Sequence, residues 1–320
     1  MVLFEIIFDP EHFRCMLDIV TISQLGACVT GITMHLLFVS YTRNLTSIIV
    51  VFLILLSALN PAFAQMLGRG ERTIPPPTAP KLSDFPKQKF TFCTIAYTNN
   101  GRDEDLGFGW NTDYPDSGYN FMIRLEELTT VEINKDQQGE PVQKVLLLTD
   151  PALFDYPYIF MSDVGRLIFS RQEADRLQQY LLRGGFLHVD DFWGEGAWNS
   201  WVAQLNYVLP PDEYDIVDIP LSHELFSIVF NVEEYPQVPS IQHWNRSGGM
   251  TTSERGAETE KVHFRGVFDK NGRLMVLMTH NTDIADGWEK EKEDQEYFER
   301  FSVKKSYPIG INIVVYALTH

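Results

Sequence analysis

Hydrophobic and polar positions along the chain form two kinds of pattern, one typical of buried strands and one typical of amphipathic helices. KFTFCTIAY (residues 89–97) is rich in aromatic and β-branched residues and predicts a first strand. VLLLT (145–149) is uniformly apolar, as is typical of a strand covered on both faces. GFLHVDD (185–191) predicts a further strand, and VHFRGVFDKNGRLMVLMTH (262–280) predicts a hairpin that turns at Asn271-Gly272.

The clearest helix begins after Ser170. Ser170 and Glu173 have the S-x-x-E spacing of a capping box, and small or aliphatic residues recur beyond them at helical spacing. Gly184 predicts the end of this helix, because glycine adopts the left-handed conformation at a helix end without steric cost.

Three further segments have helical spacing, namely residues 119–130, 290–302 and 309–318. Helices thus alternate with strands of the buried type. The pattern predicts one α/β domain with a mostly parallel sheet and an antiparallel hairpin near one edge.

The first 64 residues differ in composition from the rest of the chain. LTSIIVVFLILLSAL (45–59) has the length of the apolar core of a signal peptide and is shorter than the roughly 20 residues of a bilayer span. Ala62-Phe63-Ala64 then supplies a small-x-small cleavage pattern. We interpret residues 34–64 as a signal peptide and expect export across the inner membrane, to the periplasm or the cell surface. The alternative is an uncleaved membrane anchor.

The flanks of this segment complete the predicted organisation. Residues 1–33 carry four acidic side chains where a signal peptide should be basic, so we interpret them as an over-extended start. Residues 65–88 are rich in proline and predict an extended linker, which leaves residues 89–320 as the α/β domain. Only Cys93 follows residue 64, so the exported form has no intramolecular disulfide.

The net charge of −17 restricts the class of partner. Such a negative field repels phosphate backbones and anionic lipid, so we exclude nucleic acid. A small molecule, a glycan or an envelope protein remains, and association with a membrane complex stays open.

Polar groups follow three of the predicted strands. Asp150, the pair Asp190 and Asp191, and His280 with Asn281 each stand where a strand ends. In open parallel sheets these ends form one rim, where ligands bind. Asp150 precedes a proline and is interpreted as a turn or helix cap. The aspartate pair either caps a loop or forms a site, and on a regular strand only one of the two faces a crevice, for which we choose Asp190.

The loop HNTDIADGWE (280–289) holds the densest group of polar side chains. Its oxygen ligands suit Ca²⁺ or Mg²⁺, but the spacing does not match an EF-hand. The alternative is a helix start with acids near its positive end. The ligand-binding candidates of the whole chain are Asp113, Tyr114, Asp190, Asp191, Trp193, His223, His280, Asn281, Asp283, Asp286, Trp288 and Glu289.

Two of these candidates come from less specific signals. Asp113 and Tyr114 belong to a polar loop of about twenty residues after the first strand, and a loop of that length is usually functional or mobile. His223 is a lone histidine beside apolar residues, for which a structural role is the simpler interpretation. His188, inside a buried strand, is expected to form hydrogen bonds in the core.

Several common chemistries have no motif in this chain. HExxH, GxxxxGK[ST] and GxSxG are absent, as are a paired CxxC and a GxGxxG that opens a helix after a strand. No cofactor class is therefore indicated beyond a divalent metal, for which Asp190, His280 and Asp283 are the candidate ligands.

Seven segments, taken in order, resemble the DUF4159 family, a bacterial domain family of unknown function. They are TDYPDSGYNF (112–121), RLEELT (124–129), YLLRGGFLHVDDFWG (180–194), LSHELF (221–226), NGRLMVL (271–277), HNTDIADGWE (280–289) and YPIGINIVVYALTH (307–320). The resemblance implies a class I glutamine amidotransferase-like fold, which is a flavodoxin-like α/β sandwich with helices on both faces of the sheet. In true amidotransferases the matching strand leads to a cysteine nucleophile, whereas here it ends in Val189-Asp190-Asp191.

Three functional hypotheses follow. The preferred one is a noncatalytic binding domain of the cell envelope, with a polar, aromatic-rimmed cleft for a small molecule, a glycan or a partner peptide. The second is a metal-dependent hydrolase in which Asp190, His280 and Asp283 hold the ion and Asp191 or Glu289 is the general base. The third is a structural envelope protein that contacts a membrane complex.

Overall fold

The computed structural model describes residues 89–99 and 107–320, which belong to the compact unit Pro75–His320. The predictions of an over-extended start, a signal peptide and a linker fall on residues 1–88, outside the described part of the chain. None of the described helices combines the length and the apolar character that a bilayer crossing requires.

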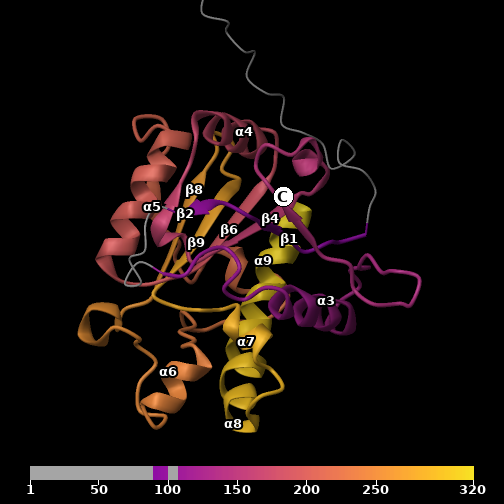
Figure 1. Ribbon diagram of the computed structural model, residues 1–320, viewed down its shortest axis with the longest axis vertical. Helices are drawn as coiled ribbons and strands as arrows, with labels where there is room; N and C mark the ends of the chain where they lie inside the picture. The colour runs from indigo at the N-terminus through magenta and orange to yellow at the C-terminus, as the bar shows by residue number, and fades with distance from the viewer. Residues whose placement is uncertain (1–88, 100–106) are drawn as a thin grey trace, which may run out of the picture. The chain divides into compact units, whose positions relative to one another are not determined.

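A seven-stranded, mostly parallel sheet forms the centre of the domain, as predicted (Figure 1). Five neighbouring strands are parallel, the sixth is antiparallel to the fifth, and the seventh is antiparallel to the sixth. In spatial order the strands are β3 (Lys144–Leu146), β1 (Cys93–Ile95), β4 (Tyr158–Ser162), β6 (Phe186–Phe192), β9 (Leu274–His280), β8 (His263–Phe268) and β7 (Ile216–Asp218). The predicted hairpin is β8 with β9, one strand in from the edge.

A second, two-stranded antiparallel sheet pairs β2 (Thr98–Asn99) with β5 (Leu167–Ile168). The sequence predicted one strand over residues 89–97, but only Cys93–Ile95 forms β1. The chain then leaves the main sheet to build this small sheet beside it.

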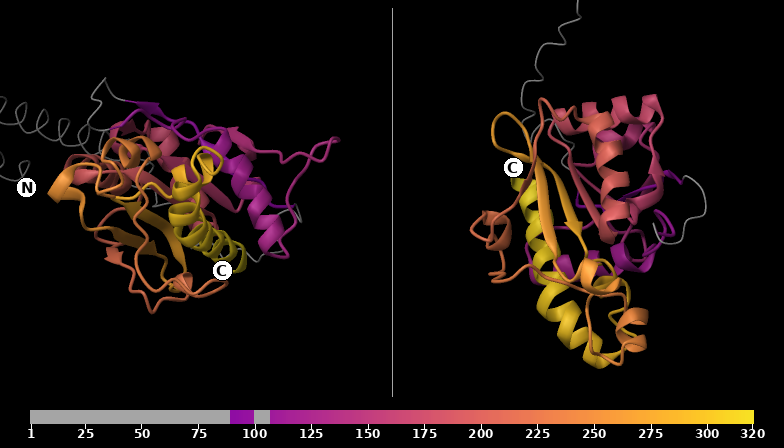
Figure 2. Two further views of the ribbon diagram at one scale, coloured as in Figure 1. Left: turned by 90° about the horizontal axis from the view of Figure 1, so that it is seen from below. Right: turned by 90° about the vertical axis from the view of Figure 1, so that its left-hand side faces the viewer.

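Helices cover both faces of the main sheet, as Figure 2 shows. α3 (Asp116–Leu128) and α9 (Tyr307–Thr319) pack on one face, and α4 (Arg171–Leu182) and α5 (Gly194–Val208) pack on the other. Successive residues of β4 alternate between the two cores: Phe160 belongs to the first, and Ile159 and Met161 belong to the second. This period of two explains why central strands are apolar throughout.

The capping box predicted for α4 is present. Ser170 Oγ accepts the backbone N–H of Glu173 at 3.3 Å, and the Glu173 carboxylate accepts the backbone N–H of Ser170 at 2.8 Å. Gly184 follows the helix with φ 103°, which an L-residue with a side chain rarely adopts. Side-chain chemistry at both ends therefore fixes the extent of this helix.

The C-terminal region differs from the prediction of two helices over 290–302 and 309–318. α8 (Gln295–Tyr297), the π-helical segment η7 (Phe298–Ser306) and α9 follow one another without a gap. Pro308, which has no N–H to donate, is the second residue of α9. The shorter elements are η3 (Pro151–Asp155), η4 (Val164–Arg166), η5 (Glu224–Phe226), α6 (Ile241–Arg246), η6 (Gly256–Thr259) and α7 (Asp286–Glu289).

Candidate functional site

Three neighbouring parallel strands end in the same unusual backbone conformation. Asp163 follows β4 with φ 57°, Asp191 lies near the end of β6 with φ 53°, and Asn281 follows β9 with φ 62°. Non-glycine residues rarely adopt this left-handed region, and asparagine and aspartate are the ones that most often do. The conformation turns the chain sharply at the carboxyl edge of the sheet, where we had predicted a site.

A bulge at the end of β6 explains how Asp190 and Asp191 are arranged. Val189 pairs with Met278 and Phe192 pairs with His280, so two residues of β6 stand opposite one residue of β9. The strand is therefore irregular at this point, so the alternation of a regular strand, on which we chose Asp190 over Asp191, does not apply here. The charges of both Asp190 and Asp191 act on the carboxyl group of Asp283.

Asp190 is completely buried. Its Oδ1 accepts the hydroxyl of Thr279 at 2.5 Å, and its Oδ2 accepts the backbone N–H of Ala285 at 2.9 Å. Burial raises the pKa of Asp190 to about 7, although these hydrogen bonds favour the ionised form. Asp190 thus joins the end of β6 to β9 and to the loop after β9.

A glycine-rich loop brings Asp113 to this edge. The Asp163 carboxylate accepts the backbone N–H groups of Phe108 and Gly109, the latter at 2.8 Å. A Cβ atom on Gly107 would overlap the carboxylate, so only glycine allows this approach. Asp113 then accepts the hydroxyl of Ser162 at 2.7 Å. The polar loop that the sequence singled out supplies one of the site residues.

Asp283 and Asp286 come from the loop and helix after β9. Asp283 Oδ1 accepts the backbone N–H of Asp286 at 2.8 Å. Asp286 Oδ2 accepts the Tyr297 hydroxyl at 2.7 Å and the backbone N–H of Ile241 at 2.9 Å. Each carboxylate is therefore oriented through one oxygen. The hydrogen bonds among the described residues do not reach the second oxygen of either group.

The three aspartates Asp113, Asp283 and Asp286 form what we name the carboxylate cluster. Each offers one oxygen, and these oxygens all lie within 4.8 Å of one another. The three residues are only 2%, 3% and 3% exposed. Carboxylate oxygens are the kind of ligand that Ca²⁺ and Mg²⁺ prefer, and three at this separation can supply part of the oxygen shell of such an ion.

Electrostatics make the cluster unfavourable without a cation. Burial raises the pKa of Asp113 and of Asp283 well above the usual range, and neighbouring carboxylates raise it further. Burial also raises the pKa of Asp286, to about 7. The carboxylates therefore hold protons near neutral pH unless a positive charge replaces them.

His280 does not join this cluster. Its ring lies 4.9 Å from that of Phe192 and 5.2 Å from that of Trp198, on the α5 side of the sheet, and its Nε2 donates to the carbonyl of Gly194 at 3.1 Å. The preceding residue, Thr279, faces Asp190 on the other side. The predicted metal ligands Asp190, His280 and Asp283 are thus not brought together, because adjacent strand residues point to opposite faces.

The aromatic candidates are distributed over different environments. Trp288 is completely buried beside Phe121, with ring centroids 4.5 Å apart, so it belongs to the core and not to a cleft rim. Trp193 donates its Nε1–H to Asp191 at 3.0 Å. Tyr114 is 41% exposed and lies against Trp110. Of the three, Tyr114 alone presents a large surface to solvent.

Three other candidates have structural contacts. Asn281 accepts the backbone N–H of Gly194 and donates to the carbonyl of Lys261, both at 2.9 Å. His223 accepts the backbone N–H of Leu225 and packs against Tyr316, which contacts the start of β9 and not its end. Glu289 forms an ion pair with Lys290 at 3.0 Å. None of the three belongs to the carboxylate cluster.

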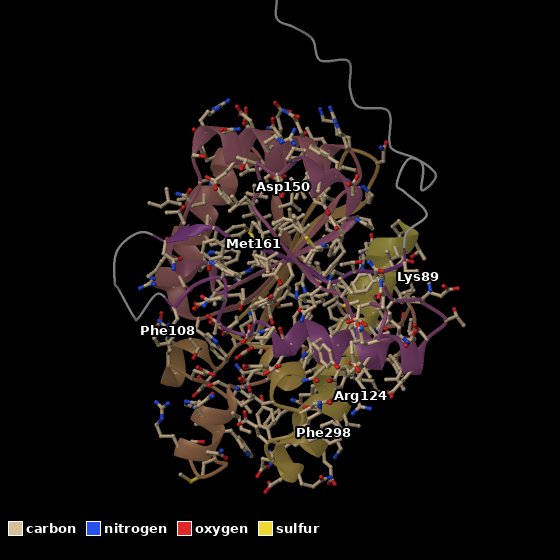
Figure 3. All side chains as sticks on the ribbon, turned by 45° about the vertical axis from the view of Figure 1, so that its right-hand side comes forward. Lys89, Phe108, Arg124, Asp150, Met161 and Phe298 are labelled. Atoms are coloured by element: carbon tan, nitrogen blue, oxygen red, sulfur yellow. The ribbon has the colours of Figure 1, made fainter. Side chains whose placement is uncertain are left out.

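Asp150 is a cap, as we interpreted it. Its side chain accepts the backbone N–H of Ala152 at 2.9 Å at the start of η3. In Figure 3 it lies nearer the α4 end of the domain than Phe108 does. His188 is also structural: it lies 3.0 Å from the Tyr158 hydroxyl and 3.2 Å from the Thr279 hydroxyl.

The sequence interpretation missed several residues that orient the site, namely Ser162, Asp163, Thr279 and Tyr297. A signal existed for the first two, since YIFMSD (158–163) is an apolar run that ends in polar residues like the other strands.

A depression of about 390 Å³ lies elsewhere, and no predicted site residue lines it. Its lining residues are Glu234, Tyr235, Gln237, Thr252, Glu260, Lys261, Val262 and Lys305.

Comparison with known proteins places the chain in a family. The family described as "Domain of unknown function (DUF4159)" matches residues 92–318. The chain therefore belongs to the DUF4159 family, as its segments suggested. A search of curated proteins gives no match.

Proposed function

We propose that this DUF4159 protein is a noncatalytic binding domain of the cell envelope, and that its carboxylate cluster binds a hard divalent cation, Ca²⁺ or Mg²⁺. The observation that carries the proposal is the convergence of Asp113, Asp283 and Asp286 within 4.8 Å in a buried position. A buried carboxylate without a compensating charge costs several kcal/mol, so three of them together favour a bound cation.

The way the aspartates are held supports a binding role. Ser162 holds Asp113, and Tyr297 with the Ile241 amide holds Asp286. Hydrogen bonds of this kind orient metal ligands in proteins before the ion arrives. The ligands come from two segments far apart in sequence, so the ion would also join the loop after β2 to the loop and helix after β9.

The finer fold assignment is part of the proposal. We infer a class I glutamine amidotransferase-like domain in which the left-handed residue at the end of β6 stands at the elbow of that fold. In this chain the residue is Asp191, a carboxylate and not a thiol. Binding is proposed in place of hydrolysis because His280 lies on the other face of the sheet and no cysteine occupies the elbow.

The cellular location is proposed from residues 34–64, whose composition suits a signal peptide. Export would place the domain in the periplasm or at the cell surface, where a small molecule, a glycan or an envelope protein is available as a further partner. Tyr114 follows Asp113 of the carboxylate cluster in sequence and is exposed to solvent, so it is a suitable contact for such a partner.

The test is a measurement of thermal stability and of heat of binding on the purified protein. After chelation, Ca²⁺ or Mg²⁺ at about 100 times its dissociation constant should stabilise the fold by roughly 2.7 kcal/mol. For a domain of this size that raises the Tm by about 5 to 10 °C. Asp283→Asn should remove the response, because the amide keeps the hydrogen bond from Asp286 but not the charge.

The matched control is Asp212→Asn, which removes one carboxylate from an exposed position outside the cluster. This variant should respond to the cation like the parent. A parent protein that neither binds Ca²⁺ and Mg²⁺ nor gains stability from them would contradict the proposed cation site.

A further inference from the structure

Asp190 differs from the three residues of the carboxylate cluster in what occupies its oxygens. Protein donors reach both of them: the Thr279 hydroxyl is 2.5 Å from Oδ1, and the Ala285 amide is 2.9 Å from Oδ2. The backbone N–H groups of Asp191 and Ile284 also favour its ionised form. Asp190 is thus held as a buried acceptor of protein hydrogen bonds.

A chain of buried polar groups continues behind Thr279. Thr279 Oγ1 lies 3.2 Å from His188 Nε2, and His188 Nδ1 lies 3.0 Å from the Tyr158 hydroxyl. The side chains of Tyr158, His188, Thr279 and Asp190 are each no more than 1% exposed. Four polar side chains thus form a connected network in the core beneath the site, where unpaired polar groups are costly.

The number of available protons tells which group donates and which accepts in each hydrogen bond of this network. The Thr279 hydroxyl has one proton, and its two acceptors are Asp190 Oδ1 and the Val189 carbonyl at 3.0 Å. While Asp190 is ionised, that proton goes to one of these two acceptors, and His188 Nε2 donates to Thr279. Burial lowers the pKa of His188 to about 3, so the ring is neutral and its bare Nδ1 accepts the Tyr158 proton.

The Asp190 end of the hydrogen-bond network reaches the carboxylate cluster. Ala285, whose amide Asp190 accepts, lies between Asp283 and Asp286. The Asp190 carbonyl also accepts the backbone N–H of Asp163 at 3.0 Å, and Asp163 holds the loop that carries Asp113. Asp190 is thus bonded directly to the segment that supplies Asp283 and Asp286, and through Asp163 to the loop that supplies Asp113.

We infer that Asp190 is a positioning residue and not a cation ligand: with Thr279, His188 and Tyr158 it fixes the loop that presents Asp283 and Asp286. This inference rests on the proposed cation site. It assigns to the first aspartate of the Asp190-Asp191 pair a different role from the one that the sequence indicated.

The test compares Thr279→Val with Thr279→Ser. Valine keeps the shape of the side chain but removes the donor to Asp190, whereas serine keeps the hydroxyl. Loss of a direct partner of metal ligands typically weakens metal binding by about 10 to 100 times, and Thr279 acts one contact further out, through Asp190, so the lower end of this range applies. We expect a loss of that size in the dissociation constant for Ca²⁺ of Thr279→Val, measured by calorimetry, and recovery to within about threefold of the parent in Thr279→Ser.

The Tm of each variant in chelator separates positioning from general stability. A merely structural role would lower the Tm of Thr279→Val and leave the Ca²⁺ affinity of the folded protein unchanged, which would overturn the inference. A parent that binds no Ca²⁺ would overturn the cation site itself and, with it, this role for Asp190.

A second measurement needs no variant. The imidazole nitrogens of His188 in the ¹⁵N-labelled parent should show a neutral ring with the proton on Nε2. A proton on Nδ1, or a charged ring at neutral pH, would overturn the proposed chain. This result is independent of Ca²⁺, so it distinguishes a wrong hydrogen-bond chain from a wrong cation site.

Discussion

The two sides of the sheet at the ends of β6 and β9 have opposite chemical character, although neighbouring residues of the same two strands build both. On the α3 side, Asp190 and Thr279 lead to the carboxylate cluster. On the α5 side, Phe192 and His280 pack with Trp198, and the Arg265 guanidinium lies 4.1 Å from the centre of the Trp198 ring. We call this second group the His280 cluster, comprising Phe192, Trp198, His263, Arg265 and His280.

The difference shows how strand geometry separates residues that are adjacent in sequence. Thr279 and His280 are neighbours, but one faces Asp190 and the other faces Trp198. The bulge at Asp191 has the reverse effect, because it leaves two neighbouring carboxylates near the same cluster. Position in the sequence therefore predicted the edge of the sheet at which these residues lie. Backbone geometry decided which side of the sheet each of them faces.

The largest expected effect is on the stability of the domain in chelator, to which the two sides contribute with opposite dependence on pH. Burial raises the pKa of Asp286 to about 7, so the folded domain keeps a proton that the unfolded chain releases above a pKa of about 4. Stability from this side falls as the pH rises through 7. Burial lowers the pKa of His280 to about 3, so stability from the His280 side is lost as the pH falls below about 6.5.

Each of these shifts corresponds to about 4 kcal/mol of unfolding free energy. The Asp286 contribution is lost between about pH 4 and pH 7, and the His280 contribution is gained as the pH rises to about 6.5, so the two oppose each other in the parent. Denaturant unfolding of the parent, Asp286→Asn and His280→Gln in chelator from pH 5 to 8 separates them. From pH 5 to 7, stability should fall more in His280→Gln than in the parent and less in Asp286→Asn, by about 2 kcal/mol in each case. A profile of Asp286→Asn identical to that of the parent would show that its carboxyl is not the cause.

A smaller effect is expected on cation affinity. Binding of Ca²⁺ must displace protons from the cluster carboxylates, so affinity should weaken as the pH falls, by up to about tenfold for each pH unit below 7 from Asp286 alone. Calorimetric titrations at pH 6, 7 and 8 measure the dissociation constant. His280→Gln should show the same ratio between pH 6 and 8 as the parent. Equal affinity at all three pH values in the parent would argue against carboxylate ligands.

The smallest expected effect is on the His280 side. Arg265→Gln removes the contact with the Trp198 ring, worth about 0.5 to 1 kcal/mol at a partly exposed position. Its ion pair with Asp218 adds little, because Asp218 is 73% exposed. Denaturant unfolding should show this loss, and Ca²⁺ affinity should stay within about twofold of the parent. A larger change in affinity would mean that the two sides are coupled.

Much of the architecture followed from the local pattern. The capping box at Ser170, the hairpin around Asn271-Gly272 and the apolar run before Asp190 all formed as predicted. In each case the signal lies within a few residues and the physical cause is local, either a hydrogen bond between neighbours or the alternation of side chains along a strand. A mostly parallel sheet with helices on both faces then follows.

The elements that we did not predict have weak local signals. α5 begins with GEGAW, and two glycines in the first turn disfavour a helix by about 1 kcal/mol each. Packing of Trp201 and Leu205 against the sheet outweighs this cost. β4 has only five residues, too few to distinguish a buried strand from a buried helical turn by periodicity.

The candidate site could be predicted only in part. Asp113, Asp283 and Asp286 were all among the candidates, but nothing local relates Asp113 to residues that follow it by about 170 positions. Trp288 was expected at a cleft rim because it neighbours acids in sequence, and the packing of α7 against α3 buries it instead. Ser162 and Tyr297 orient the cluster from other elements and carry no motif of their own.

The sequence by itself determined the class of fold, the edge of the sheet at which polar groups gather and the family to which residues 92–318 belong. These properties depend on periodicity and on residue types within short segments. Only the tertiary structure decided that Asp113 joins Asp283 and Asp286, that Asp190 holds their loop and that His280 faces the other way. These outcomes depend on a bulge, on left-handed residues at three strand ends and on packing between distant segments, where contacts far apart in sequence outweigh local preference.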